Sequence, residues 1–290
     1  MCFKLQPSTI QLLRIKFSFF LMPIYWFALS QINKIDFYRA VLVFVILHLM
    51  VYPASNGYNS FMDKDEESIG GIKHPLPPTK QLLHATILLD GLALFAALFV
   101  NTYFFTALTF YILASKAYSY RKIRLKKLPI VSYIIAIVFQ GAVVYSMVAK
   151  GCDIINLASF ASLPAIASTF IVGSFYPLTQ IYQHKQDKAD NIKTISMLLG
   201  YKGTFLLAAI MFFTAILLIG YYFATNLELN RFLILLDCLL PTLIYFLWWY
   251  NKVRQDNDAA NFRNTMRINW IAAICSNTAF IIIFIIKERF

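Results

Sequence analysis

The sequence is short of charge, and above all of acidic charge. Only 14% of the 290 residues are charged, and 14 residues are Asp or Glu against 26 that are Lys or Arg. A soluble globular domain is nearer a quarter charged and half apolar, whereas this chain is 59% hydrophobic with a mean hydropathy of +0.63. One water-soluble core could not hide so much apolar surface, which excludes an ordinary soluble fold.

Cysteine is also scarce, and its four positions (Cys2, Cys152, Cys238 and Cys275) show no CxxC spacing. This pattern argues against both a zinc site and a disulfide framework. The alternating strands of a membrane β-barrel are not seen. The net charge of +12 lies in loops between apolar blocks, so we expect the lipid bilayer to be the partner of the basic residues, and we expect no nucleic acid.

Long apolar blocks are what the sequence has in abundance. A helix needs about 20 mainly apolar residues to cross a bilayer, and nine such blocks follow one another. They cover residues 12–32, 37–59, 83–100, 102–118, 129–149, 156–176, 204–225, 231–250 and 267–287. We therefore predict an all-α, polytopic membrane protein, a nine-transmembrane-helix bundle that forms a single membrane-embedded domain over residues 1–290. The third and fourth spans meet at Asn101, which predicts a tight antiparallel hairpin.

The basic residues favour one side of this bundle. The N-terminal end and the even-numbered loops, with the span ends beside them, hold 20 of the 26 Lys and Arg residues. Because cytoplasmic loops carry an excess of Lys and Arg, we expect the N-terminus and these loops in the cytoplasm and the C-terminus outside. We expect a multi-pass protein of a bacterial inner (cytoplasmic) membrane.

Acidic and amide side chains follow the second span at helical spacing. Asn59, Asp63 and Glu67 stand at i, i+4 and i+8, so they share one face if the helix continues, about 6 Å apart per step. A row of oxygen ligands suits a hard cation such as Mg²⁺, which usually shares its coordination with substrate phosphates. The alternative is a solvated acidic loop beside the membrane.

A second row follows the sixth span, where Gln183, Asp187 and Asn191 repeat the same spacing. Each of these residues lies 124 positions after its counterpart in the first row, four spans later and on the same predicted side. That constant offset indicates an internal repeat. Each half of the chain would then present a polar helix end at the same membrane face.

A cationic segment ends the fourth span, where five of the seven residues from Arg121 to Lys127 are Lys or Arg. Such a cluster can bind phosphate, with Arg offering a forked donor and Lys a point charge. Lys122 and Arg124 are the favoured candidates, and Lys122 stands one helical turn after Tyr118. The alternative is ordinary anchoring by the positive-inside rule.

Together these three loops resemble the UbiA superfamily of intramembrane prenyltransferases. That family has nine helices, with motifs of the form Asn-Asp-x-x-Asp-x-x-x-Asp after helix two and Asp-x-x-x-Asp followed by Gly-x-x-Thr after helix six. The first motif is matched by Asn59, Asp63 and Glu67, with Ser60 at the second position. Glu67 replaces the family's last Asp.

The second motif is matched by Asp187 and Thr194, while Gln183 replaces its first Asp. Tyr118-x-x-x-Lys122 matches a further family element, and Lys73-His74-Pro75-Leu76-Pro77 resembles its Lys-Pro-x-Arg-Pro segment without the Arg. A neutral amide such as that of Gln183 brings no charge to a metal.

The resemblance implies Mg²⁺-dependent transfer of a prenyl group from an isoprenoid diphosphate to a lipophilic acceptor, often an aromatic one, within the membrane. The expected metal ligands are Asn59, Asp63, Glu67, Gln183 and Asp187. The expected catalytic residues are Asp63, Asp187 and Lys122. The expected substrate contacts are Asn56, Lys73, Tyr118, Lys122, Arg124, Asp190 and Lys193.

Three other functions remain open from the sequence. Asp90 and Asp237 lie inside apolar spans, where acidic side chains are costly and usually functional or paired, and with the repeat they would suit a membrane transporter. A terpene cyclase of the same fold would ionise the same diphosphate without an acceptor. A non-catalytic relative would bind isoprenoid lipid.

Overall fold

The computed structural model describes residues 5–64, 66–155 and 162–289, and within these ranges the chain is helical, with no strand. The first half contains α1 (Pro7–Leu12), the 3₁₀ helix η1 (Ile15–Phe20), α2 (Met22–Ser30), α3 (Phe37–Phe44), the π-helix η2 (Val45–Val51), α4 (Tyr52–Asp63), α5 (Lys80–Ala97), α6 (Thr102–Ser119) and η3 (Leu125–Lys127). The second half contains α7 (Pro129–Val138), the π-helix η4 (Phe139–Val143), α8 (Val144–Cys152), α9 (Leu163–Phe175), η5 (Tyr176–Gln183), α10 (His184–Ala189), α11 (Ile195–Thr225), α12 (Leu229–Gln255), η6 (Asn257–Ala259) and α13 (Phe262–Arg289).

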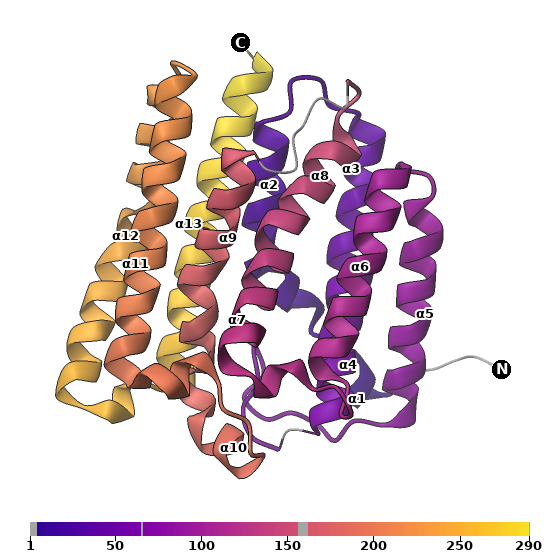
Figure 1. Cartoon of the computed structure of the whole chain (residues 1–290), viewed down its shortest axis with the longest axis vertical. Coiled ribbons are helices and arrows are strands. Elements are labelled where there is room, and N and C mark those ends of the chain that lie inside the picture. The colour runs from indigo at the N-terminus through magenta and orange to yellow at the C-terminus, as the bar shows by residue number, and fades with distance from the viewer. Residues whose placement is uncertain (1–4, 65, 156–161, 290) are drawn as a thin grey trace.

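The long helices stand side by side in one bundle (Figure 1). Helices α5 and α6 form one flank, α11 and α12 form the other, and α1 and α10 lie at the same end. Seven helical segments of the described chain are long and apolar enough to cross a membrane. The protein is therefore a multi-pass integral membrane protein, as its sequence predicts.

Two of the nine predicted spans fall outside that set of seven. Helix α6 covers the predicted 102–118 span, and α9 covers part of the predicted 156–176 span, whose residues 156–161 lie outside the described ranges. Both helices stand upright among the others (Figure 1). By length and composition alone the described residues give seven spans, so the count of nine stays a prediction.

The predicted hairpin between the third and fourth spans is confirmed. Helix α5 ends at Ala97 and α6 begins at Thr102, and the two helices pack against each other. The Asn101 side chain caps α6, because its Oδ1 accepts a hydrogen bond of 2.8 Å from the Phe104 backbone N–H. Asn is among the residues preferred at this position, since its side chain satisfies an unpaired N–H of the first turn.

The first predicted span is broken rather than continuous. Arg14 lies between α1 and η1 in the left-handed region, at φ 47°. Its guanidinium donates hydrogen bonds to the carbonyl oxygens of Asn56, at 3.1 Å, and Gly70, at 3.5 Å. The break therefore ties the start of the chain to α4 and to the loop that follows it.

A close backbone contact fixes the middle of the bundle. A Cβ on Gly141 would lie 2.5 Å from Cα of Thr169, so only glycine allows η4 to approach α9 this closely. The Ala142 N–H donates to Thr169 Oγ1 at 3.2 Å. This contact holds the π-helical turn that carries Gln140 toward the cavities described below.

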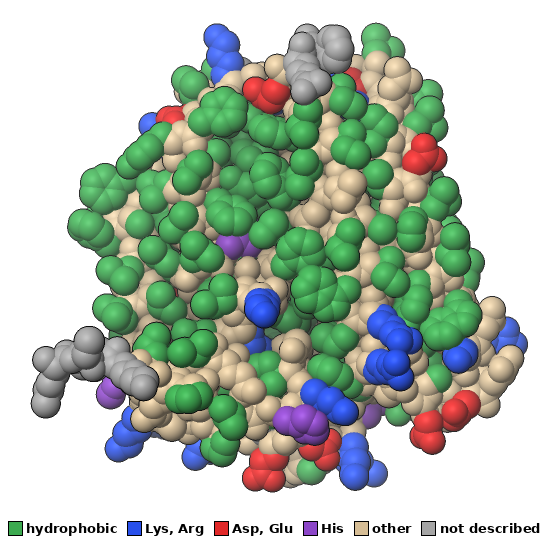
Figure 2. All heavy atoms as spheres, turned by 180° about the vertical axis from the view of Figure 1, so that it is seen from behind, with side chains coloured by type: hydrophobic (Ala, Val, Ile, Leu, Met, Phe, Trp, Pro, Cys, Tyr) green, Lys and Arg blue, Asp and Glu red, His purple; other side chains and the backbone are tan. Residues whose placement is uncertain are grey.

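Apolar side chains cover most of the face in Figure 2, and charged side chains gather at one end of it. Many large apolar residues on the long helices are exposed, among them Leu88, Phe110, Leu206, Leu217 and Ile244. In water such a surface would associate, whereas in a bilayer it faces lipid.

Candidate functional site

A charged cavity of about 240 Å³ opens at one end of the bundle. Its walls come from α4, α6, η3, η4, η5 and α10, so both halves of the chain contribute. Its charged and amide lining residues are Arg14, Asn56, Asn59, Asp63, Lys126, Gln140, Gln180, Gln183, Gln186, Asp187 and Asp190. The two predicted rows of oxygen-bearing residues therefore converge, at least in part, on one hollow.

Asp63 is the last residue of α4, and its side chain is only 4% exposed. The helix ends there because Lys64 adopts a left-handed conformation at φ 56°, with its N–H donating to the Ser60 carbonyl at 3.0 Å. The Asp63 carboxylate forms an ion pair with Lys126, at 2.5 Å, and lies 3.9 Å from Arg124 Nη2. A helix end thus delivers one carboxylate into the cavity.

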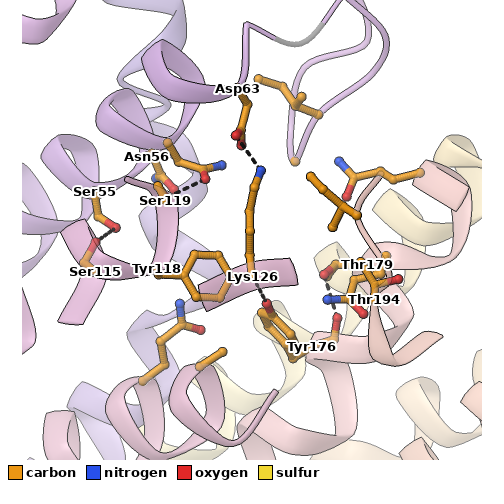
Figure 3. A pocket seen from close by; sticks show the side chains of 18 of the residues that line it. Ser55, Asn56, Asp63, Ser115, Tyr118, Ser119, Lys126, Tyr176, Thr179 and Thr194 are labelled. Carbon is orange, nitrogen blue, oxygen red and sulfur yellow. Dashed lines mark hydrogen bonds and ion pairs between the residues drawn. The ribbon is translucent and has the colours of Figure 1, made fainter. Parts of the chain in front are cut away.

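Lys126 reaches into the cavity from η3, with its ammonium group pointing at Asp63 (Figure 3). The chain turns sharply after α6, where Arg124 takes a left-handed conformation at φ 45°. Lys122, which the sequence favoured, is exposed and does not line the cavity, whereas Arg124 is half-buried beside Asp63. Nothing in the run of five cations singles out Lys126, because the choice depends on the turn at Arg124.

Asn59 lies one helical turn before Asp63 and lines the same cavity. Its Oδ1 accepts a hydrogen bond of 2.7 Å from the Ser119 hydroxyl of α6. Asn56, three residues before Asn59 on the same helix, also lines the cavity. Helix α4 therefore presents two amide groups and one carboxylate to the hollow.

Two tyrosines meet across the cavity (Figure 3). The hydroxyls of Tyr118, from α6, and Tyr176, from η5, are 2.5 Å apart, and both side chains line the cavity. The Tyr118 hydroxyl lies close enough to Asp63 and Asp187 to interact electrostatically with both carboxylates. Those two carboxylates come from opposite halves of the chain, and both line the charged cavity around this hydroxyl.

The second half contributes Gln183, Asp187 and Asp190, all of which line the cavity. Here the chain passes from α9 through the 3₁₀ turns of η5 into the short helix α10. His184, at the start of α10, is hydrogen-bonded to the Ser196 hydroxyl at 2.7 Å and stacks on Tyr201. Burial lowers the pKa of His184, so its ring is neutral at pH 7 and adds no positive charge to this side.

Besides Lys122, three further predicted site residues lie outside the charged cavity. Glu67 and Lys73 are exposed and line a separate surface hollow together with residues of the α12–α13 loop. Lys193 is exposed and does not line the charged cavity. The assumption that the second span stays helical as far as Glu67 is wrong, because α4 ends at Asp63. Asp65, which stands between Asp63 and Glu67 in the sequence, lies outside the described residues.

Arg14 also lines the charged cavity, and it is not among the residues predicted from the sequence. The sequence predicted one continuous helix over residues 12–32, and an arginine near the start of such a helix would anchor it at the membrane surface. The left-handed break turns its side chain inward instead, over the Phe17 ring at 5.6 Å. A basic residue inside an otherwise apolar first span was the available signal.

An apolar cavity of about 170 Å³ adjoins the charged one. Seven residues line both: Phe17, Ser55, Asn56, Tyr111, Gln140, Tyr176 and Thr179. We call these seven the shared wall. The apolar cavity extends among α2, α9 and α13, and no charged side chain is among its lining residues in the described chain.

The intramembrane acids sit outside both cavities. The buried Asp90 of α5 forms an ion pair of 2.6 Å with Lys116 of α6. The Lys116 ammonium group also lies over the Tyr58 ring, 4.1 Å from its centroid. Asp237 is exposed on α12. Asp90 thus has a structural partner that offsets the cost of its charge in the membrane.

The charged cavity has the donors that a hard cation prefers. Within the described ranges no three His, Cys, Asp or Glu side chains group closely enough to hold a metal by themselves. The carboxylates of Asp63, Asp187 and Asp190 nevertheless line one hollow with the amides of Asn59 and Gln183. Because Mg²⁺ is usually held by one or two carboxylates together with substrate phosphates, this donor set fits the ion when a phosphate ligand is present.

The sequence matches the UbiA prenyltransferase family over residues 20–271. No curated protein matches it. Among solved structures, a UbiA homolog from Archaeoglobus fulgidus bound to DMAPP and Mg²⁺ has a TM-score of 0.67 at 17% identity, covering 95% of this chain and 99% of that one. The apo UbiA homolog from Aeropyrum pernix K1 has a TM-score of 0.69 at 18% identity, covering 93% and 98%.

A digeranylgeranylglyceryl phosphate synthase has a TM-score of 0.59 at 16% identity, covering 98% of each chain. At these identities the likeness shows a common fold along nearly the whole length.

Proposed function

Because this chain belongs to the UbiA prenyltransferase family, we propose that it transfers a prenyl group from an isoprenoid diphosphate to a lipophilic acceptor within the membrane. The observation that carries the proposal is the pair of joined cavities, one charged and one apolar, that meet at the shared wall. An isoprenoid diphosphate has the same two parts, a highly charged head and an apolar tail.

The diphosphate head would lie in the charged cavity. Lys126 and Arg14 line this cavity and supply positive charge from two separate segments of the chain, and Arg124 adds a further cation beside Asp63. A diphosphate leaves carbon with the electron pair of the broken C–O bond, so cations that face its oxygens stabilise the transition state. Arg can donate two parallel hydrogen bonds to phosphate, whereas Lys acts as a point charge.

Magnesium would be held mainly by Asp187 and Asp190, with Asn59 and Gln183 supplying amide oxygens from the two halves. When bound, the ion would neutralise negative charge that develops on the leaving diphosphate. Glu67, which the sequence predicted as a ligand, is not part of this proposed set because it lies outside the charged cavity.

The prenyl tail would lie in the apolar cavity, with its reacting carbon at the shared wall. Loss of diphosphate leaves an allylic cation, and the faces of Tyr111, Tyr176 and Phe175 line this region. Aromatic faces attract cations. The acceptor would then form a bond to the cationic carbon and lose a proton. An aromatic acceptor, as the resemblance implies, is the finer form of the proposal.

The test uses the full chain purified in lipid nanodiscs, with labelled dimethylallyl or geranyl diphosphate and Mg²⁺. We expect release of pyrophosphate and appearance of a prenylated lipid when phenolic, quinol and glycerol-based acceptors are supplied. Mass spectrometry identifies the product. Pyrophosphate release with a cyclised hydrocarbon and no acceptor adduct would favour the cyclase. Solute uptake with no release of pyrophosphate would contradict the proposal.

A further inference from the structure

The carboxylate of the first half already has a cation as its partner. Lys126 Nζ lies 2.5 Å from Asp63 Oδ1, and the two side chains are 11% and 4% exposed. Arg124 Nη2 lies 3.9 Å from the same oxygen. An ion pair this well buried is strongly coupled, because separating it would leave an uncompensated charge out of water.

Few other acids are available on that side of the cavity. Of the first motif's described acidic residues, Asp63 lines the charged cavity, while Glu67 lies in the separate hollow beside the α12–α13 loop. The second half places two carboxylates, Asp187 and Asp190, in the charged cavity. The acidic groups are thus unevenly divided, and the side with fewer of them is the side with the lysine.

A divalent ion at Asp63 would have to share the carboxylate with the Lys126 ammonium, which already holds Oδ1. Two cations on one carboxylate repel each other, and the repulsion is strong where water is scarce. An ammonium group, by contrast, has three N–H donors. Lys126 can therefore keep one hydrogen bond to Asp63 and still donate to the oxygens of a ligand in the cavity.

We propose that Lys126 stands in for a divalent ion on the Asp63 side, so that the site binds a single divalent ion, on the Asp187 and Asp190 side. This inference rests on the proposed function, because it presumes a diphosphate in the charged cavity. Lys126 joins the first half of the chain to the diphosphate, as a metal ion would.

The test counts ions rather than turnover. Mn²⁺ replaces Mg²⁺, and electron paramagnetic resonance measures bound Mn²⁺ on the full chain in nanodiscs saturated with geranyl thiodiphosphate, whose bridging sulfur slows the loss of the leaving group. We expect one Mn²⁺ per chain with analogue bound. Two Mn²⁺ per chain would overturn the inference alone, whereas no binding of the analogue would overturn the proposed function and the inference with it.

A second experiment substitutes Lys126 and measures how tightly the analogue binds. Lys126→Gln should weaken analogue binding by at least about tenfold at fixed Mn²⁺, while Lys126→Arg, which keeps the charge, should restore most of the affinity. The matched control is Lys127→Gln, because Lys127 is its exposed neighbour. The melting temperature of each variant confirms that it is folded. Unchanged affinity in folded Lys126→Gln would overturn the inference.

Discussion

The two halves of the chain bring polar groups to the same cavity in different ways. In the first half, α4 runs without a break from Tyr52 to its end at Asp63. In the second half, the chain leaves α9, winds through the 3₁₀ turns of η5 and only then forms α10, which carries Asp187. The first half thus offers one carboxylate paired with a lysine, whereas the second half offers two carboxylates.

In both halves the last residue of the predicted row lies outside the charged cavity. In both, the first two positions of the predicted row line the charged cavity and the third does not, so Glu67 and Asn191 are exposed outside it. The chain leaves the helix through a left-handed residue each time, Lys64 at φ 56° and Asn191 itself at φ 53°. A constant spacing in sequence therefore predicts a shared position only as far as the helix extends.

The difference between the halves is tested most severely at the two aspartates. Asp187→Asn should lower kcat for pyrophosphate release by about 100-fold or more, as the loss of a group that stabilises a developing charge does. Asp63→Asn should cost less, because Lys126 and Arg124 remain to face the substrate. Steady-state assays with labelled geranyl diphosphate measure both. Asp258→Asn, in the exposed α12–α13 loop, is the control.

If Asp63→Asn lowered kcat as much as Asp187→Asn, the comparison would fail, because the two halves would then be equivalent in binding the metal.

The next effect in size separates two lysines of one segment. Lys126→Gln should lower kcat/KM for the diphosphate by roughly 10- to 50-fold, because it removes a buried charge-assisted hydrogen bond. Lys122→Gln, the lysine that the sequence favoured, should cost less than about threefold, since an exposed charge is screened by solvent. The same assay measures both, and the reverse order would show that the loop rearranges around the substrate.

Arg14 tests whether the broken first span belongs to the site. Arg14→Lys keeps the charge but loses the forked geometry that phosphate recognition uses. We expect KM for the diphosphate to rise about five- to tenfold with kcat little changed. The assay is run beside Lys16→Ala, an exposed cation of the same segment. Equal KM values in the two variants would remove Arg14 from the site.

The smallest effect is expected at the motif's last acid. Glu67→Gln should change turnover by less than about twofold, because its side chain is exposed and lies outside the charged cavity. Titration of activity with Mg²⁺ is the measurement. A clear rise in the Mg²⁺ concentration needed for half-maximal rate would show that the loop closes and brings Glu67 to the metal, as the sequence predicted.

The sequence alone predicted the parts of the fold that depend on local chemistry. Runs of about 20 apolar residues mark helices such as α13, and Asn101 marked the turn between α5 and α6, because burial in lipid and helix capping act over short stretches. The breaks were missed. Arg14 turns inward because backbone carbonyls 42 and 56 positions away accept its hydrogen bonds. Its charge inside an apolar span marked the position, but no local pattern predicts the direction of its side chain.

The same limit applied to the site. Asp63 and Asp187 could be predicted because acidic residues are rare beside the apolar spans and because each stands at the middle position of a row with the same spacing. Lys126 was not, because it is one of five cations in seven residues, and the left-handed turn at Arg124 decides which of them points inward. Residue type thus indicated which kinds of side chain line the charged cavity, and long-range packing decided which members of each kind do so.

The shared wall has a consequence for how substrate choice can change. Tyr176 and Phe17 line both cavities, so in the proposed binding mode they would border the charged head of the substrate and its hydrocarbon tail alike. A substitution there that admits a bulkier isoprenoid would then also move the surroundings of the bond that breaks. Tail preference and turnover are therefore expected to vary together among variants of this wall, and selection for one will drag the other along.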